Sequence, residues 1–520
     1  MTLASTHAAL RAPRRGSFAP VARSRRTLPH DASASLALAL YSNGDERVFP
    51  DAVTGRTKYG TPRGCAEDEI WFSSSTASAI SPRGHAAAAE AWQALAHGRM
   101  TAEDCCESVR LRLTQLFGIA GTQTILTGSG TEAVLVSLIL ARMLFRRRIA
   151  TIIVGCEETG RGVSAAAAGR HFLHHAAFDE VAPGGRLEGL DDIDALVDTV
   201  AIRDSDGALR PETEIDAEVA QKAEAALRDG RDLLIHSLDV SKTGQSAPSL
   251  GILAQIRDAA PERIAILADC CQLRCSPPHI QAYLKSGFLV SLTGSKFAGG
   301  PPFAGALLVP PFILDRLRPR LLPKGLAAYS AQRDWPSALR ALLPLTELPA
   351  ANIGLALRWH AALAEIESFF TWPAHLRETI LIRFHEEVAR RVCDTPDFDL
   401  LPPPPASATT WGHTILAVAM RGHNGHCLGM DEAAAVQRRL REGLGTHRFH
   451  LGQPVAIGTM GVLRVCASAV LANDVAEAMS DGATLTDAFA PTAAALDDLF
   501  RAWQSILQAD GNRVHASMSV

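Results

Sequence analysis

The chain of 520 residues is 47% hydrophobic and 20% charged, which excludes an intrinsically disordered, collagen-like or small disulfide-stapled protein. Its 51 basic and 55 acidic side chains give a net charge of −4, so we expect neither a nucleic-acid nor a membrane partner. No apolar run reaches the roughly 18–20 residues that span a bilayer. For this length we expect about two or three domains.

The ten cysteines form no CxxC pair and no His/Cys cluster with the spacing of a zinc site. Several lie in apolar runs, where cysteine behaves as a small buried side chain. We therefore predict a cytoplasmic protein without a structural metal. Residues 1–30 hold six arginines and no acidic residue. Two interpretations of this segment stay open, a disordered basic arm and an organellar transit peptide.

Residues 1–65 show no sustained hydrophobic period, so we predict an irregular N-terminal arm there. From 66 to 330, apolar strands alternate with helices, which indicates a large α/β domain whose parallel sheet is covered on both faces. Strands are predicted at 70–72, 124–126, 150–155, 233–238, 263–268, 288–292 and 304–309. Helices are predicted at 82–96, 101–117, 131–145, 163–173, 249–260 and 278–285.

The pattern changes after about residue 310, and we predict a smaller α+β domain over 331–520. Its predicted helices are 350–370, 376–393, 431–444 and a segment from 473 onward. Its predicted strands are 414–419 and 462–467. Within the large domain, the stretch 179–218 is acidic and rich in turn residues, and Ser205-Asp206-Gly207 indicates a hairpin or turn.

A glycine-rich turn, Gly128 to Glu132, joins a predicted strand to a predicted helix. Such a turn offers free backbone N–H groups and the positive end of the helix dipole to a phosphate. It has neither the GxGxxG spacing of a dinucleotide site nor the GK[ST] of a P-loop, so a nicotinamide-dependent oxidoreductase is poorly supported. Taken alone, the turn fits a phosphate site and a plain helix cap equally well.

Two charged residues follow neighbouring predicted strands. Asp269 comes directly after strand 263–268, where α/β sheets place ligand contacts, although a helix N-cap role is equally open. Lys296 follows the next strand, and the GGPP run after it prevents a helix. Partial burial at such a position lowers the pKa of an amine, as Schiff-base chemistry requires. The chain has only six lysines, and the other five lie in helical or loop segments without this setting.

Together, the ordered motifs GSGTEA, ADCCQ, SLTGSKFAGGPPFAGALLV and GVLRVCASA resemble those of fold type I pyridoxal-phosphate-dependent enzymes. The similarity is to the class V aminotransferase and cysteine desulfurase superfamily, and it spans residues 70–507. It implies a mostly parallel, seven-stranded sheet with helices on both faces, beside a smaller α+β domain. It also implies pyridoxal 5′-phosphate as cofactor, a small-molecule amino acid as substrate, and a homodimer.

The resemblance also implies roles for single residues. Lys296 would carry the cofactor as a Schiff base and move the proton at the substrate Cα. Asp269 would pair with the ring nitrogen, and Gln272 would contact the phenolic oxygen. Arg464 would bind the substrate α-carboxylate, with an ordinary strand-edge arginine as the alternative. Four residues would hold the cofactor phosphate: Gly130, Thr131, Thr293 and Ser295.

Two of the expected cofactor contacts depart from the family pattern. Thr159 stands where the family stacks a ring on the cofactor, and it offers only a methyl and a hydroxyl group. Ser241 stands where the family often has asparagine. The small-residue loop 73–78 resembles the one that the family folds over the substrate. His450 and Gln453 are open to two interpretations, lining of the substrate site and a structural role.

The resemblance favours an aminotransferase of class V type. A pyridoxal-phosphate-dependent lyase, decarboxylase or carbon–carbon bond-forming enzyme is the second reading, because the bond that breaks depends on its orientation to the ring. The segment 447–460 lacks the nucleophilic cysteine of desulfurases, which disfavours sulfur transfer through a persulfide. A degenerate, noncatalytic scaffold is a third reading, and the retention of Lys296, Asp269, Thr131 and Arg464 weighs against it.

Overall fold

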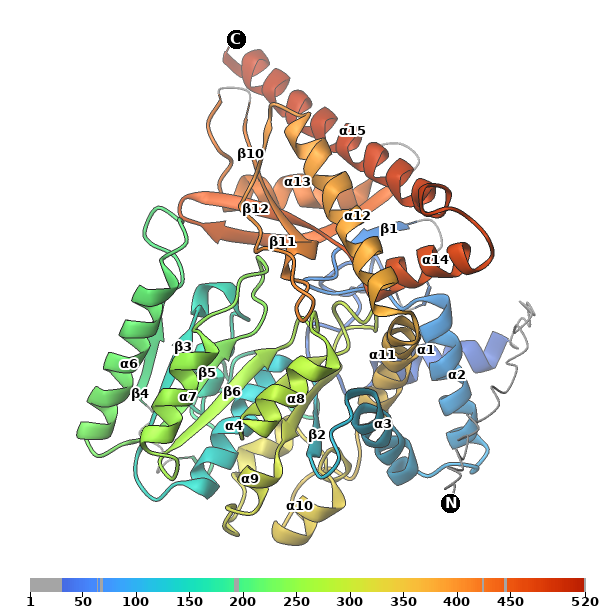
Figure 1. The fold of residues 1–520 in the computed structure, drawn as a ribbon. Helices are drawn as coiled ribbons and strands as arrows, with labels where there is room; N and C mark the ends of the chain where they lie inside the picture. Colours follow the sequence, from blue (N-terminus) through green and yellow to red (C-terminus); the bar gives the residue numbers. More distant parts are fainter. Residues whose placement is uncertain are drawn as a thin grey trace, which may run out of the picture.

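The computed structural model describes residues 30–62, 64–65, 69–190, 196–422, 425–443 and 447–518, with side chains between 36 and 509 of these ranges. Two sheets organise the fold, a seven-stranded sheet and a five-stranded sheet that lies above it in the view of Figure 1. None of the described helices combines the length and apolar character that crossing a membrane requires.

The large sheet has the strand order β2-β8-β7-β6-β5-β3-β4, and only β8 runs antiparallel to its neighbours. Its strands are β2 (Gln123–Thr127), β3 (Ile149–Val154), β4 (Leu196–Val200), β5 (Asp232–Leu238), β6 (Ile264–Cys270), β7 (Leu289–Thr293) and β8 (Gly305–Val309). Leu233 and Ile235 of β5 point into one apolar core, and Leu234 between them points into another. The strands are continuously apolar because the sheet is buried on both faces.

Helices from the alternating half of the chain cover the two faces of this sheet. Helix α4 (Gly130–Leu144) belongs to the core on one face, and α6 (Glu212–Arg228), α7 (Leu250–Ala259) and α8 (Pro277–Lys285) contribute to the core on the other. Figure 1 shows α6, α7 and α8 in front of the strands. The shorter elements here are η1 (Cys156–Glu158), α5 (Val163–Ala167), α9 (Pro311–Leu314), η2 (Lys324–Ala328), η3 (Gln332–Asp334) and α10 (Ser337–Leu342).

The small sheet has the order β1-β11-β12-β10-β9. Its strands are β1 (Glu69–Phe72), β9 (Phe398–Leu400), β10 (Ile415–Met420), β11 (Arg448–Ile457) and β12 (Met460–Cys466). Strand β1 precedes the large sheet in sequence, yet it pairs in parallel with β11 at the edge of the small sheet. This pairing brings the segment after β1 to the junction between the two sheets.

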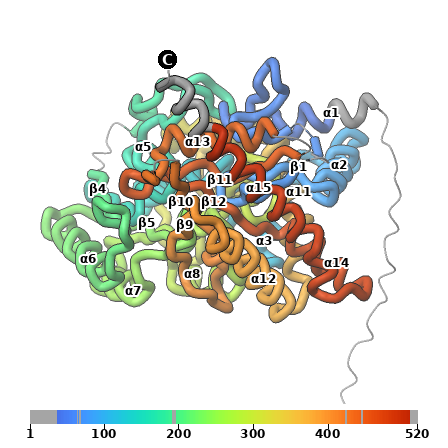
Figure 2. The backbone as a smooth tube through the Cα atoms, turned by 90° about the horizontal axis from the view of Figure 1, so that it is seen from above, coloured from blue at the N-terminus to red at the C-terminus, as the bar shows by residue number. Residues whose placement is uncertain are grey.

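Long helices pack beside the small sheet and along the junction, as Figure 2 shows from above. They are α1 (His30–Tyr41), α2 (Pro82–Ala96), α3 (Ala102–Phe117), α11 (Ile353–Thr371), α12 (Ala374–Cys393), α13 (Met430–Glu442), α14 (Ala469–Ser480) and α15 (Leu485–Met518), with a short η4 (Gly412–Thr414). Helix α3 begins with a capping box in which Thr101 and Asp104 bond to each other's backbone N–H.

The expected fold class is confirmed: a mostly parallel seven-stranded sheet stands beside a smaller α+β part. Two local predictions were wrong: the segment 30–41 is helical, and the helix expected over 163–173 ends as α5 at Ala167. That helix stops because Gly169 has a φ of +67°. The turn expected at 205–207 is present, closed by the hydrogen bond from the Gly207 N–H to the Asp204 carbonyl. The domain boundaries at 65 and 330 stay predictions.

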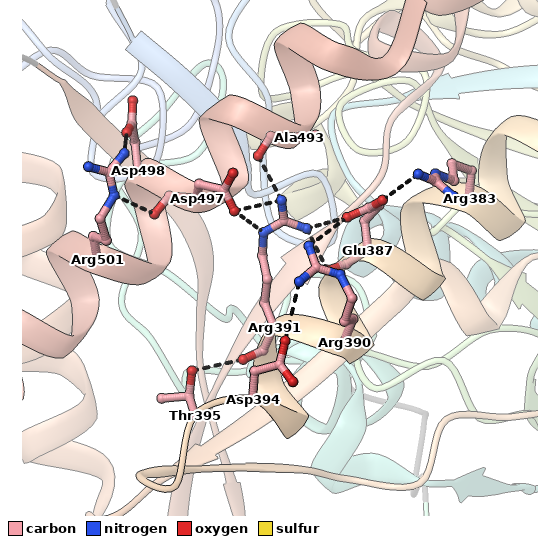
Figure 3. A network of polar contacts seen from close by, with 10 residues as sticks. All are labelled: Arg383, Glu387, Arg390, Arg391, Asp394, Thr395, Ala493, Asp497, Asp498 and Arg501. Atoms are coloured by element: carbon pink, nitrogen blue, oxygen red, sulfur yellow. Dashed lines mark hydrogen bonds and ion pairs between the residues drawn. The ribbon is translucent and has the colours of Figure 1, made fainter. Parts of the chain in front are cut away.

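The packing of α15 on α12 centres on one buried arginine, Arg391 (Figure 3). Its guanidinium donates to Glu387 on α12 at 2.5 Å. It also donates to the Asp497 carboxylate at 2.8 Å and to the Ala493 carbonyl at 2.9 Å, both on α15. Arg391 therefore ties the last helix of the chain to the small sheet's helical cover.

Replacing Arg391 with alanine should destabilise the protein by about 2–4 kcal/mol, because the buried Glu387 carboxylate loses a charged donor and α12 loses its bonds to α15. The urea midpoint, followed by far-UV circular dichroism, measures this loss. Arg383→Ala is the matched control, because Arg383 is 39% exposed and makes one ion pair with Glu387. The control should cost less than about 1 kcal/mol. Equal losses in the two variants would contradict the assignment.

Candidate active site

A cavity of about 360 Å³ lies where the carboxyl ends of β5, β6 and β7 face strands β11 and β12. In α/β folds, ligands usually bind in the crevice outside the carboxyl ends of the parallel strands. All the predicted site residues except Ser241 line this cavity. The structure thus brings the glycine-rich turn, the ends of β6 and β7 and strand β12 to one cavity, although they are far apart in sequence.

The glycine-rich turn forms one end of the cavity. The Ser129 side chain caps the N–H of Glu132 at the start of α4. The N–H groups of Gly130 and Thr131 have no partner inside the helix, and both residues line the cavity. A Cβ at position 130 would lie 2.3 Å from the Cys271 sulfur, so only glycine lets α4 begin this close to β6. This end of the cavity is suited to an anion.

Asp269 and Gln272 form the floor between β6 and the next turn. Asp269 Oδ1 accepts hydrogen bonds from the Cys271 N–H at 3.0 Å and from the Ser291 hydroxyl at 3.4 Å. Gln272 is 2% exposed, and its Nε2 donates to the Ser75 carbonyl at 3.1 Å. Its Oε1 is buried and has no hydrogen-bond partner among the described residues. Buried acceptors are rarely left unpaired, so this oxygen indicates a ligand with a donor group.

Lys296 lies in the turn after β7, and its half-buried side chain enters the cavity. Gly299, with a φ of +73°, closes this turn by donating its N–H to the Lys296 carbonyl. Burial lowers the pKa of the Lys296 amine, and the Arg464 guanidinium lowers it further, whereas Asp269 acts in the opposite direction. A lowered pKa makes the uncharged, nucleophilic amine available near neutral pH.

Two hydroxyl side chains, those of Thr293 and Ser295, lie near Lys296 at the end of β7. Thr293 and Ser295, which flank Gly294 at the end of β7, both line the cavity. The Thr293 hydroxyl already donates to the Cys271 carbonyl at 2.6 Å.

Arg464 on β12 forms the opposite wall and is 1% exposed. It donates to the Gln453 carbonyl, to the Thr76 hydroxyl at 2.9 Å and to the Lys242 carbonyl at 3.3 Å. All these acceptors are neutral, and no carboxylate in the described ranges pairs with this guanidinium. Burial lowers the pKa of Arg464 to about 10, so it stays charged at neutral pH. A buried cation without a carboxylate suits an anionic ligand.

The loop 73–78 connects these two walls. The Ser78 hydroxyl donates to the Lys296 carbonyl at 3.0 Å, and Thr76 holds both Arg464 and the Gln453 N–H. Ser75 and Thr76 line the cavity. The small-residue loop therefore lies over the site, in the place that the sequence resemblance indicated.

Three other sequence candidates differ in their position. Thr159 lines the cavity, but its hydroxyl donates to the Cys156 carbonyl at 3.1 Å, so its methyl group is what remains for a ligand. Ser241 lies outside the lining, where its hydroxyl donates to Glu158. Of the two residues with open roles, Gln453 lines the cavity, whereas His450 stacks on Trp71 with ring centroids 3.6 Å apart.

Part of the cavity wall comes from the segment before β1 in sequence, which the sequence analysis did not predict to contribute. Four residues of this segment line the cavity: Glu46, Arg47, Lys58 and Tyr59. Arg47 pairs with Asp45 close to Glu132, the acidic residue of the glycine-rich turn. Burial raises the pKa of Glu132 to about 8. No periodic pattern marks this segment, because residues 42–62 form no helix or strand.

The described cysteines include a buried cluster that spacing did not reveal. Ligand atoms of Asp239, Cys270 and Cys275 lie within 4.8 Å of one another. Asp239 already accepts hydrogen bonds from His279 at 2.5 Å and from Tyr283 at 2.9 Å. We interpret the cluster as a structural contact that holds α8 against the end of β5. The expected absence of a metal stays a prediction.

Cys271 is the cysteine among the residues that line the cavity. Burial raises the pKa of its thiol well above the ordinary value, and the Asp269 carboxylate raises it further. The thiolate is the nucleophilic form of cysteine, so this environment does not favour attack by Cys271.

Comparison with known proteins connects this chain to solved structures through its fold. No protein-family model matches it, and no curated protein matches it. A cysteine desulfurase of Escherichia coli is similar with a TM-score of 0.53 and 14% identity, over 85% of this chain and 95% of that one. A cysteine desulfurase of Thermococcus onnurineus gives 0.52 and 15%, over 85% and 95%.

A cystine C-S lyase in complex with its product, cysteine persulfide, gives a TM-score of 0.52 and 14% identity, over 83% of this chain and 98% of that one. Identity at this level speaks for the fold alone. The chain therefore has the type I fold of pyridoxal-phosphate-dependent enzymes, as its ordered motifs predicted.

Proposed function

We propose that the protein is a pyridoxal-phosphate-dependent enzyme that acts on an α-amino acid, and that it is an aminotransferase of class V type. The observation that carries this proposal is the convergence of Lys296, Asp269, Gly130 and Arg464 on one cavity. We further propose a homodimer, as the resemblance to this superfamily implies.

The cavity fits the cofactor on an observation that does not depend on motifs. Gln272 presents a buried, unpartnered oxygen, and the start of α4 presents backbone N–H groups. When bound, pyridoxal phosphate supplies an aldehyde that links to an amine and a ring that draws electrons from the substrate Cα. Gly130 and Thr131, with Ser295, would hold its phosphate, and the Asp269 carboxylate would pair with its ring nitrogen and keep it protonated.

The chain's own groups then divide the work on the substrate. Arg464 binds the α-carboxylate through a guanidinium fork and thereby orients Cα. The Lys296 amine, with its lowered pKa, takes the Cα proton and returns it at another position. The loop 73–78 covers both residues and keeps bulk water from this proton.

A lyase, decarboxylase or carbon–carbon bond-forming reaction is the second candidate. The solved structures with this fold include desulfurases and a cystine C-S lyase, so the fold supports more than one outcome at Cα. Sulfur transfer is the least favoured of these, because the one described cysteine in the lining has a raised pKa.

The test is a titration of the cofactor-loaded protein with a panel of amino acids, read by visible absorbance and by product mass. Conversion of the bound cofactor to its amine form, with release of a 2-oxo acid, supports transamination. Carbon dioxide or a side-chain fragment would support the second candidate instead. If added cofactor gives no visible band at all, the protein is a noncatalytic scaffold and the proposal fails.

A further inference from the structure

A second lysine, Lys242, lines the cavity close to Arg464. It lies in the loop after β5, with its side chain half-buried. Two backbone hydrogen bonds hold it there. Its N–H donates to the Glu158 carbonyl at 3.2 Å, and its own carbonyl accepts from Arg464 Nη1 at 3.3 Å. The backbone of Lys242 is therefore fixed beside Arg464, the residue proposed to bind the substrate carboxylate.

The charge of Lys242 is not neutralised by the protein. The carboxylate that acts on it is that of Glu158, which is buried and already bound by Arg203 at 2.6 Å and by the Ser241 and Thr243 hydroxyls. No acidic side chain in the described part of the chain forms an ion pair with Lys242. Four cations line the cavity besides Lys296 and Arg464: Arg47, Lys58, Arg161 and Lys242. Arg47 pairs with Asp45 and Lys58 with Glu46, and of the other two Lys242 is the one whose carbonyl is bonded to Arg464.

The electrostatics of the cavity agree with this geometry. Burial, together with the positive charges of Arg464, Lys296 and Arg161, lowers the pKa of Lys242 to about 8. Cations that face one space, as these four do, repel one another unless an anion lies between them. A bound anion would therefore be stabilised by Lys242 as well as by Arg464.

We propose that Lys242 binds a second anionic group, on the side chain of the substrate, so that the enzyme acts on amino acids with an acidic side chain. This inference rests on the proposed function. Lys296 is used by the cofactor and Arg464 by the α-carboxylate, and Lys242 is bonded to Arg464 through its carbonyl, so we assign to it a carboxylate two or more bonds further along the substrate. The alternative is that Lys242 shares the α-carboxylate with Arg464.

The experiment compares acidic substrates with their neutral amides. Dissociation constants are measured by absorbance titration of the cofactor-loaded protein with aspartate, glutamate, asparagine and glutamine. The wild type should bind one acid at least about 10-fold more tightly than its amide, the effect of one hydrogen bond between charged groups. Lys242→Met should remove this preference while changing the amide affinity less than about 3-fold, and Lys242→Arg should retain most of it.

Lys285→Met is the matched control, because Lys285 is exposed on α8 and does not line the cavity. It should leave all four constants unchanged. A wild type without a preference for the acid, or an equal loss for acid and amide in Lys242→Met, overturns the inference. Failure of the proposed function itself would appear separately, as a wild type that forms no visible cofactor band.

The same preference should depend on pH. Lys242 must be protonated to bind a carboxylate, so the ratio of acid to amide affinity is full below pH 8 and falls as the pH rises through that value. The groups that face Lys242 are Arg464 on β12, Lys296 after β7, Arg161 before α5 and Glu158 in η1. The α-amines of acid and amide titrate at different pH values, so the ratio is compared with the same ratio in Lys242→Met, which keeps the substrate's own pH dependence and lacks that of Lys242. A ratio that stays constant from pH 7 to 10 would contradict the role of Lys242.

Discussion

Replacing Lys296 with alanine should reduce turnover by at least about 10³-fold, because one change removes both the amine that holds the cofactor and the base that moves the Cα proton. The structure predicts that the protein still folds. The Lys296 side chain is half-buried, and the hydrogen bonds of this residue run through its backbone to Ser78 and Gly299. Steady-state kinetics and the thermal midpoint of the same preparation measure the two effects.

The control for this prediction is Lys285→Ala, which removes an exposed lysine from α8 and should leave turnover unchanged. The cofactor should also dissociate from Lys296→Ala during gel filtration in the absence of substrate, whereas it should stay with the control. A Lys296→Ala variant that retains a tenth or more of the activity would show that another group holds the cofactor.

Replacing Arg464 with alanine should weaken amino-acid binding by about 100-fold and leave kcat much less affected, because a charged bidentate contact of this kind is worth roughly 2–3 kcal/mol. The reason is geometric. Arg464 is buried on β12, points into the cavity and has neutral partners in Gln453, Thr76 and the Lys242 backbone. The measurement is KM and kcat for the preferred amino acid.

A merely structural arginine would give a different pattern, because it would affect every ligand alike. The discriminating ligand is the primary amine that lacks the α-carboxylate. The wild type should prefer the amino acid over this amine, and Arg464→Ala should bind the two with similar affinity. Arg464→Lys keeps the charge without the fork and should recover part of the preference. Equal weakening for amine and amino acid would contradict the assignment.

The parts of the site that the sequence predicted depend on local signals. Lys296 stands at the end of an apolar strand and before GGPP, and Asp269 ends the neighbouring strand, so each was visible within about ten residues. Adjacent parallel strands deliver their carboxyl ends to one edge, which is why these two residues were expected to meet. Arg464 needed the family resemblance in addition, because nothing in its strand marks it as different from other arginines.

The parts that were missed depend on contacts between distant segments. Lys242 was grouped with lysines of no special setting, and only the approach of β12 to the loop after β5 brings it beside Arg464. The wall formed by Arg47 and Tyr59 arises because an irregular segment lies over the start of α4. Strand β11 carries the interrupted pattern HLGQPVAI, in which a register shift between Gly452 and Val455 breaks the alternation.

The most direct test of the account is borohydride reduction of the cofactor-loaded protein, followed by proteolysis and mass mapping. Reduction makes the link between the cofactor aldehyde and its lysine permanent. We predict a single pyridoxyl adduct, on the peptide that contains Lys296. An adduct on Lys242 or on any other lysine, or no adduct at all, would contradict the assignment from which the proposed function starts.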